Sequence, residues 1–123
     1  MDWKLELITL PVADVDRSIS FYAGQLGWHL DHDHRISDDL RFVQITGPGS
    51  GCSIAFGTGL IDGEHDPIRT LQVVVSDIEA AHAHLTERGI DATPIDDQPW
   101  GSFVHFEDPD GNRWAVQQLP PQE

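Results

Sequence analysis

The segment Val12-Ala13-Asp14-Val15-Asp16 has a counterpart later in the chain, Val75-Ser76-Asp77-Ile78-Glu79. Each segment follows a strand-like run and opens a run with helical spacing, which ends at Gly27 in the first copy and at Gly89 in the second. Similarity that repeats at a fixed offset indicates internal duplication. The sequence therefore predicts one structural unit that is built twice.

Each copy predicts the order strand, helix, strand, strand, strand. In the first copy, residues 5–12 are rich in strand-forming side chains, Asp14 is placed to cap a helix, and the helical stripe ends at Leu26. In the second copy, Asp77 is the corresponding cap, and residues 90–95 predict the weakest strand. Residues 28–36 alternate histidines with charged residues, which predicts a strand with its charged face toward water. Because most connections are short turns, we expect an α+β fold with a curved, mostly antiparallel sheet, both helices on its convex face and a concave cleft.

Length and composition favour one small domain. The chain has 123 residues, of which 39% are hydrophobic, and we expect a single domain over 1–123 with modules at 1–57 and 70–119 and a linker at 58–69. No apolar run reaches the length of a membrane span, and the first residues do not resemble a signal peptide. The only cysteine, Cys52, cannot form an internal disulfide, so a cytoplasmic location is expected.

Charge excludes two classes of partner. The formal net charge is −14. A field of this sign repels nucleic acid and anionic membranes, so neither is expected as a partner. It attracts cationic small molecules, or it serves only to keep the protein soluble.

Two motifs resemble those of the vicinal oxygen chelate superfamily, which includes glyoxalase I, bleomycin-resistance proteins and dioxygenases. They are the segment from Leu10 to Tyr22 around Val12-Ala13-Asp14, and the closing segment Phe106-Glu107-Asp108-Pro109-Asp110-Gly111-Asn112-Arg113-Trp114. The resemblance covers nearly the whole chain and implies two βαβββ modules. It specifies function poorly, because this fold carries many chemistries. It also implies a homodimer, since related single-domain members pair their modules across chains.

The resemblance also locates the positions at which metal-dependent members hold a divalent ion. In this sequence those positions are Leu7, Ala55, Thr70 and Ala115. Leucine and alanine carry no lone pair for a metal, and an isolated threonine hydroxyl is a poor ligand. We therefore predict that the usual metal site is lost, and no metal or other cofactor is expected.

The same comparison predicts which residues line the cleft. His105 is the first candidate for acid–base catalysis and His34 the second; each is otherwise a packed or surface histidine. His32 and His34 share one strand face, where they line the pocket, hold a noncanonical metal or form a surface pair. Trp100 either stacks on a ligand or anchors its loop. The predicted ligand-binding residues are Thr9, His32, Gln72, Trp100, Ser102, Phe103 and Gln117, of which Thr9, Gln72 and Gln117 either orient a ligand or satisfy one another.

Two functions remain open from the sequence. One is a binding protein, similar to bleomycin-resistance proteins, that sequesters an aromatic or cationic small molecule without a metal. The other is a metal-independent, glyoxalase-like enzyme that isomerises, epimerises or cleaves a small metabolite by acid–base chemistry. True metal-dependent glyoxalase activity is not expected.

Overall fold

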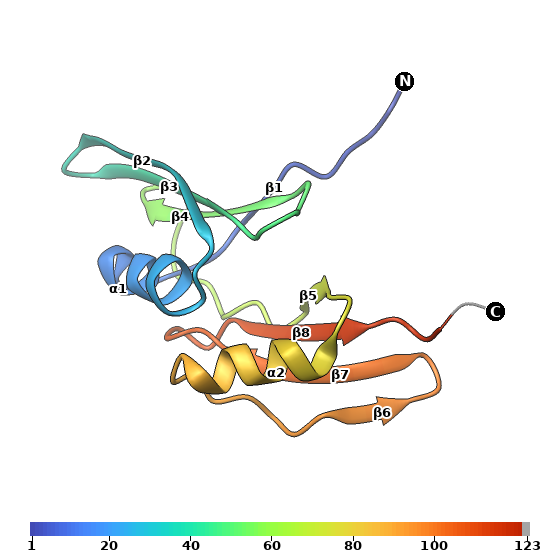
Figure 1. The fold of residues 1–123 in the computed structure, drawn as a ribbon. Helices are drawn as coiled ribbons and strands as arrows, with labels where there is room; N and C mark the ends of the chain where they lie inside the picture. Colours follow the sequence, from blue (N-terminus) through green and yellow to red (C-terminus); the bar gives the residue numbers. More distant parts are fainter. Residues whose placement is uncertain (122–123) are drawn as a thin grey trace. The chain divides into compact units, whose positions relative to one another are not determined.

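The computed structural model describes residues 1–121 of the chain and divides it into two compact units. The first unit is Met1–Pro67, and the second begins at Ile68. Each unit contains one four-stranded sheet with its own helical segment (Figure 1). Among the described residues, no helix is long and apolar enough to cross a membrane.

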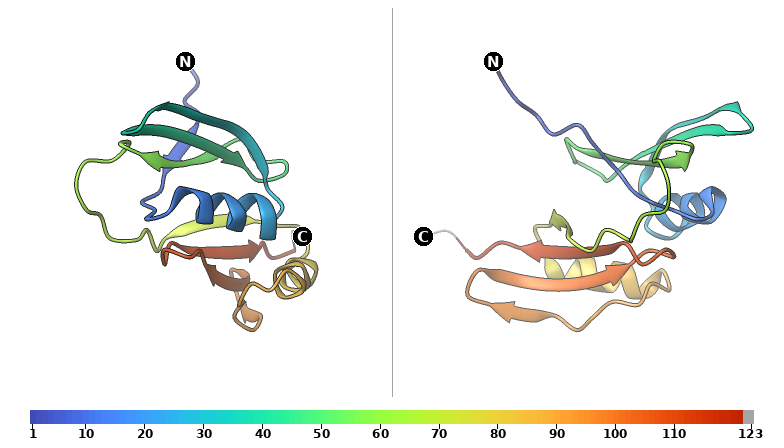
Figure 2. Two further views of the ribbon diagram at one scale, coloured as in Figure 1. Left: turned by 90° about the vertical axis from the view of Figure 1, so that its left-hand side faces the viewer. Right: turned by 180° about the vertical axis from the view of Figure 1, so that it is seen from behind.

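The first unit has the predicted order of elements. Its sheet has the strand order β1-β4-β3-β2, in which β1 is parallel to β4 and the other pairs are antiparallel (Figure 2). The elements are β1 (Leu7–Thr9), α1 (Val15–Ile19), η1 (Ser20–Gln25), β2 (His29–Ser37), β3 (Leu40–Thr46) and β4 (Ser53–Thr58).

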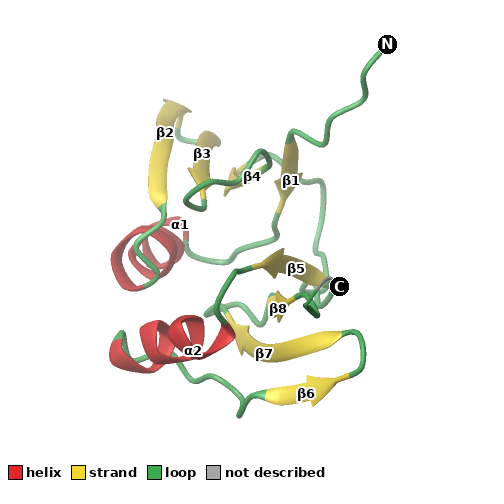
Figure 3. Ribbon diagram, turned by 45° about the vertical axis from the view of Figure 1, so that its right-hand side comes forward, coloured by secondary structure: helices red, strands yellow, loops and turns green. Residues whose placement is uncertain are grey.

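The second unit repeats this topology. Its sheet has the strand order β5-β8-β7-β6, with β5 parallel to β8 and the other pairs antiparallel (Figure 3). The elements are β5 (Leu71–Val74), α2 (Ile78–Glu87), β6 (Asp96–Gln98), β7 (Gly101–Glu107) and β8 (Arg113–Gln118). The two predicted βαβββ modules are confirmed, and their strands belong to two separate four-stranded sheets.

The repeated acidic motif caps both helices as predicted. The Asp14 carboxylate accepts a hydrogen bond from the Arg17 backbone N–H at 3.1 Å, and Asp77 accepts one from the Ala80 N–H at the same distance. Each bond satisfies an amide that has no partner within its own helix.

The first helix widens after α1, where a regular α-helix was expected to continue to Leu26. Residues Ser20–Gln25 form a π-helical turn, closed by a bond from the Leu26 N–H to the Phe21 carbonyl at 2.9 Å. Phe21 and Tyr22 are both buried here, with ring centroids 5.1 Å apart. The wider turn accompanies the burial of two adjacent aromatic residues that a narrow apolar stripe does not predict.

Each sheet buries one face against its helix. In the first unit Tyr22 packs on Phe56 of β4, with ring centroids 5.9 Å apart. In the second unit α2 contacts β7 and β8, and Trp114 of β8 is buried and stacked on Phe106. The Gln118 side chain accepts a hydrogen bond from the Ile78 N–H at the start of α2, which ties this face to the helix. The opposite face of each sheet is its helix-free face.

Two predicted strands differ from the structure. β1 covers only three residues of the expected run, and residues 90–95 do not form the expected strand; the short β6 follows directly after them. The reason for the second difference lies at Thr93. Its hydroxyl accepts from the His105 N–H at 2.8 Å, while its own N–H donates to the His105 carbonyl at 3.0 Å. A side chain that takes a backbone partner in this way competes with a regular ladder.

Candidate functional site

Strand register in the second unit brings five predicted residues or positions onto the helix-free face. Gln72 of β5 and His105 of β7 both pair with Ala115 of β8, and these three residues form a central row. In the adjacent row, Gln117 of β8 pairs with Phe103 of β7. Directly paired residues share one face of a sheet, so both rows project away from α2.

Ala115 forms a low floor in the central row. Its methyl group lies between two longer side chains, Gln72 on one neighbouring strand and His105 on the other. Strands two positions apart in a sheet are separated by about 10 Å. The row therefore places a short apolar side chain between an amide on one neighbouring strand and an imidazole on the other.

His105 is half-buried, and its environment lowers its pKa below the ordinary value of 6.5. Desolvation by burial is the main cause, followed by the positive charge of Arg113, while Asp96 acts in the opposite direction. A histidine with a lowered pKa is neutral at pH 7, and a neutral ring has one nitrogen that accepts a proton. The imidazole lies nearly parallel to the Phe103 ring, with an interplanar angle of 11° and ring centroids 6.4 Å apart. Together these two stacked rings form the aromatic wall of this face.

Gln72 and Gln117 form a hydrogen-bond relay with the loop before β7. The Gln72 Nε2 donates to Gln117 Oε1 at 2.6 Å, and the Gln117 Nε2 donates to the Trp100 carbonyl at 2.9 Å. Gln117 is buried, with 8% of its surface exposed, so its amide depends on these bonds. The two glutamines therefore satisfy each other, one of the two alternatives that the sequence left open.

Trp100, just before β7, and Ser102, within β7, differ in their contacts. Trp100 is 60% exposed as a residue, whereas its carbonyl belongs to the relay. Ser102 alternates with Phe103 along β7, and its hydroxyl donates to Asp97 Oδ1 at 2.6 Å. The structure therefore does not bring Ser102 together with the two rows of the helix-free face.

The helix-free face of the first unit repeats this arrangement with different chemistry. Thr9 and Gln44 both pair with Ala55, which is the counterpart of Ala115, and His32 pairs with Gln44. His34 follows on the same strand, and its ring lies 5.4 Å from the ring of His32. Both histidines are exposed. His34 thus belongs to the first unit and His105 to the second.

Gln44 was missed from the sequence. The sequence of residues 41–46 is typical of a strand, but only the pairing of β3 with β4 identifies Gln44 as the neighbour of Ala55. Asp31 was also missed. A register shift between Leu30 and His32 turns Asp31 toward β3, where its carboxylate accepts a hydrogen bond from Thr46. Bulges of this kind reorient side chains without a clear sequence signal.

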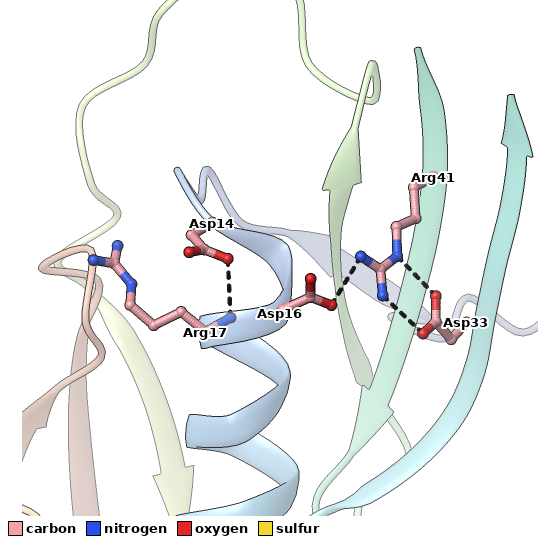
Figure 4. Close-up of polar contacts among 5 residues, drawn as sticks. All are labelled: Asp14, Asp16, Arg17, Asp33 and Arg41. Carbon is pink, nitrogen blue, oxygen red and sulfur yellow. Dashed lines mark hydrogen bonds and ion pairs between the residues drawn. The ribbon is translucent and has the colours of Figure 1, made fainter. Parts of the chain in front are cut away.

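The charged side of β2 is exposed at Asp33 and Arg35, as predicted, but Asp33 also takes part in an ion triad that the sequence did not predict. Asp33 accepts two hydrogen bonds from Arg41, from Nε at 3.0 Å and from Nη2 at 2.9 Å, and Arg41 Nη1 lies 3.0 Å from Asp16 Oδ1 of α1 (Figure 4). The Arg41 hydrogen bonds lower the pKa of Asp33, and the two carboxylates raise the pKa of Arg41. This ion triad connects α1 to the β2–β3 hairpin within the first unit.

The residues present do not fit the metal that many members of this fold hold. Two of the four implied positions, Leu7 and Ala55, lie on the paired strands β1 and β4 of the first unit. The other two are Thr70 and Ala115. These side chains supply one hydroxyl and no carboxylate, imidazole or amide. Within residues 1–121, no group of three or more His, Cys, Asp or Glu side chains is placed to hold a metal ion.

Comparisons with known proteins place the chain in a family. The sequence profile of the Glyoxalase/Bleomycin resistance protein/Dioxygenase superfamily matches residues 4–116. Similar solved structures include TnmS3, an antibiotic binding protein from Streptomyces sp. CB03234, at 27% identity and TM-score 0.85 over 97% of this chain and 98% of that one. A glyoxalase/bleomycin resistance protein from the same organism is 28% identical, with TM-score 0.80 over 94% and 100% of the two chains.

A member of the superfamily from Sphaerobacter thermophilus DSM 20745 is 27% identical, with TM-score 0.83 over 95% of this chain and 98% of that one. None of the curated proteins compared with the chain matches it significantly. The family profile spans most of the sequence, and the solved structures share its fold. The chain therefore belongs to the glyoxalase/bleomycin resistance protein/dioxygenase superfamily.

Proposed function

We propose that this protein binds a small aromatic molecule, neutral or cationic, on the helix-free face of its second unit and sequesters it without a metal. The observation that carries the proposal is the central row. Ala115 provides an apolar floor between the side chains of Gln72 and His105. Metal-dependent members of the superfamily have a metal-coordinating residue at this position. Small-molecule sites typically combine an apolar surface with a few polar groups in this way.

The aromatic wall supports an aromatic ligand. The rings of Phe103 and His105 are nearly parallel and stacked, so an aromatic ligand can extend the stack on the outer face of either ring. Flat rings favour stacked partners, with a gain of about 1 kcal/mol per contact beyond the burial of area. The exposed indole of Trp100 adds a further aromatic group at the end of the same strand.

Charge and relatives support the same class of ligand. The chain has a formal charge of −14, which disfavours anions and favours neutral or cationic molecules. A structure described as an antibiotic binding protein aligns with 97% of this chain at 27% identity. The proposal extends a binding role of that general kind to this protein. It includes a cytoplasmic location and a homodimer, and light scattering of the purified protein tests the dimer.

A metal-independent enzyme is the second candidate, and the state of His105 favours it. Burial lowers the pKa of this histidine, so its neutral ring can accept a proton from a bound substrate. His105 alone would then act as the base on the second unit. His34, on the first unit, is the alternative proton carrier.

One experiment separates the two functions. A panel of planar aromatic compounds is screened by thermal shift, each hit is measured by isothermal titration calorimetry, and the ligand is then recovered after long incubation with excess protein. Recovery of unchanged ligand supports sequestration, whereas conversion that His105→Ala abolishes without loss of affinity supports the enzyme. A large thermal shift with Zn²⁺, Ni²⁺ or Mn²⁺, retained without any organic ligand, would contradict the metal-free proposal.

A matched pair of variants tests the location of the site. Phe103→Ala removes part of the aromatic wall and is expected to weaken binding about tenfold. Ile36→Ala is the control, because Ile36 is an exposed apolar residue (67%) near the end of β2 in the first unit. Equal affinities for the two variants would place the ligand elsewhere.

A further inference from the structure

We infer that the relay from Trp100 through Gln117 to Gln72 makes Gln72 Oε1 a fixed hydrogen-bond acceptor that selects ligands bearing an N–H or O–H donor. The inference rests on the proposed function, because it assigns a chemical preference to the same face. It adds a residue, Gln72, that determines specificity and a second, Gln117, that positions it.

The direction of the relay is set at its first member. A backbone carbonyl only accepts hydrogen bonds, so the Trp100 carbonyl requires the amide nitrogen of Gln117, which lies 2.9 Å away. The oxygen of the same amide must then face Gln72. The distance from Gln72 Nε2 to Gln117 Oε1 is 2.6 Å, and it is consistent only with donation by Gln72.

This direction decides which atom of Gln72 is available to a ligand. The nitrogen is engaged by Gln117, whereas Oε1 has no hydrogen-bond partner among the residues that the structure describes. Gln72 is itself exposed, so this oxygen needs no internal partner. Both lone pairs of Oε1 can therefore accept from a ligand that lies over Ala115.

Gly101 makes the relay sterically possible. Its φ is +139°, a conformation that favours glycine, and a Cβ at this position would lie 3.0 Å from Gln117 Nε2 and 2.6 Å from the Gln118 carbonyl oxygen. The missing side chain leaves room for the Gln117 amide to approach the carbonyl of the preceding residue. The close packing of loop and strand is therefore matched to the relay.

The charges around the face agree with a preference for donors. Asp96 of β6 pairs with Phe103, so its carboxylate projects from the same face. This carboxylate lies at the sheet edge opposite Gln72, where it disfavours ligands that carry negative charge and favours those with polarised N–H or O–H groups. Phenols, anilines and protonated aromatic amines are the chemical class that fits.

The test compares two probes that differ in one donor. Calorimetry measures the affinities of 2-naphthol, which carries an O–H, and 2-methoxynaphthalene, in which that donor is absent. We expect the naphthol to bind the wild-type protein about threefold to tenfold more tightly, the range for one hydrogen bond. If neither probe binds, the proposed function fails for this class. If both bind with equal affinity, the aromatic site stands and the inference about Gln72 is wrong.

Two variants locate the preference. Gln72→Met removes the acceptor and should reduce the affinity ratio to about one. It also removes the donor to Gln117 Oε1, so circular dichroism first checks that the variant is folded. Gln117→Met keeps Gln72 but removes its anchor, and it should also reduce the ratio, because the Gln72 amide can then turn either end toward the ligand. Gln25→Met, on the exposed surface of η1, should leave the ratio unchanged. A Gln117→Met protein that is folded and keeps the full ratio would show that the relay does not position Gln72.

Discussion

Replacing Gly101 with alanine should destabilise the protein by about 2 to 6 kcal/mol. Two terms contribute. The residue has a φ of +139°, which costs an L-residue about 1 to 3 kcal/mol. The new Cβ would also lie 2.6 Å from the Gln118 carbonyl oxygen, a contact that forces the loop away from β8 at a cost of about 1 to 3 kcal/mol.

Three other glycines separate these terms. Gly49 has a φ of +76° with no atom within 4 Å of an added Cβ, so Gly49→Ala reports the backbone term alone, at about 1 to 2 kcal/mol. Gly57 has no positive φ, but its Cβ would overlap the Arg41 carbonyl oxygen, so Gly57→Ala reports the steric term. Gly24 lies in η1 with neither problem, and Gly24→Ala should stabilise the protein by about 0.5 to 1 kcal/mol.

Urea unfolding followed by circular dichroism measures all four variants against the wild type. The midpoint is compared, together with the slope, because a chain with two compact units need not unfold in one step. The reasoning is refuted if Gly101→Ala loses no more stability than Gly49→Ala. Such a result would mean that the loop moves away from Gln118 without cost, and the relay through Gln117 would then lose its steric basis.

Three further predictions concern the ion triad, the floor and the histidine. Arg41→Met should cost about 2 kcal/mol of folding stability, whereas Asp16→Asn should cost less than about 1, because Asp16 is 80% exposed. Arg41 lowers the pKa of Asp33 below 3.8, so the stability difference between wild type and Arg41→Met should be present above that pH and disappear as acid protonates Asp33. Urea titrations at several pH values measure this difference. Ala115→Glu should weaken aromatic probe binding at least about tenfold, since it fills the floor with a charge, and unchanged calorimetric affinity would contradict the location of the site. NMR titration should place the pKa of His105 below 6.5, so that this residue lowers folding stability as the pH falls through that value; a pKa above 6.5 would remove the argument for a neutral base.

The repeated motif predicted most of the fold, because each of its signals acts locally. Asp14 and Asp77 cap their helices through bonds to residues three positions away, and a contact of that range is visible in sequence. The alternation along β8, in which Trp114 is buried and Ala115 lies on the opposite face, is equally local. Because the pattern occurs twice, each element of one module supports the prediction of its counterpart in the other. The family profile matches residues 4–116.

The parts that the sequence did not predict depend on contacts between strands. Thr93 replaces a ladder bond through its hydroxyl, which shifts the edge strand from residues 90–95 to Asp96–Gln98. Asp31 is reoriented at a register shift in β2, and Arg41 forms ion pairs with both Asp16 of α1 and Asp33 of β2. In each case the deciding partner lies on another element, so no pattern within one strand reveals it.

The candidate site was predicted in composition and not in organisation. Gln72, Phe103, His105 and Gln117 were named from alternation and resemblance, and the register places them on one face of the second unit. The relay that links the two glutamines ends on a backbone carbonyl, which has no sequence signature. Whether these residues bind a ligand stays a prediction for the experiments above.

The long strand β2 has a consequence for the behaviour of the protein in concentrated solution. It lies at one edge of its sheet and is nine residues long, whereas β1, β5 and β6 at the other edges have only three or four. A long exposed edge invites other chains to add as further strands, which is the first step toward aggregation. Here two register shifts interrupt the edge, and its side chains alternate aspartate, histidine and arginine. The same irregularity that hid Asp31 from prediction therefore protects the protein from polymerising along its most vulnerable edge.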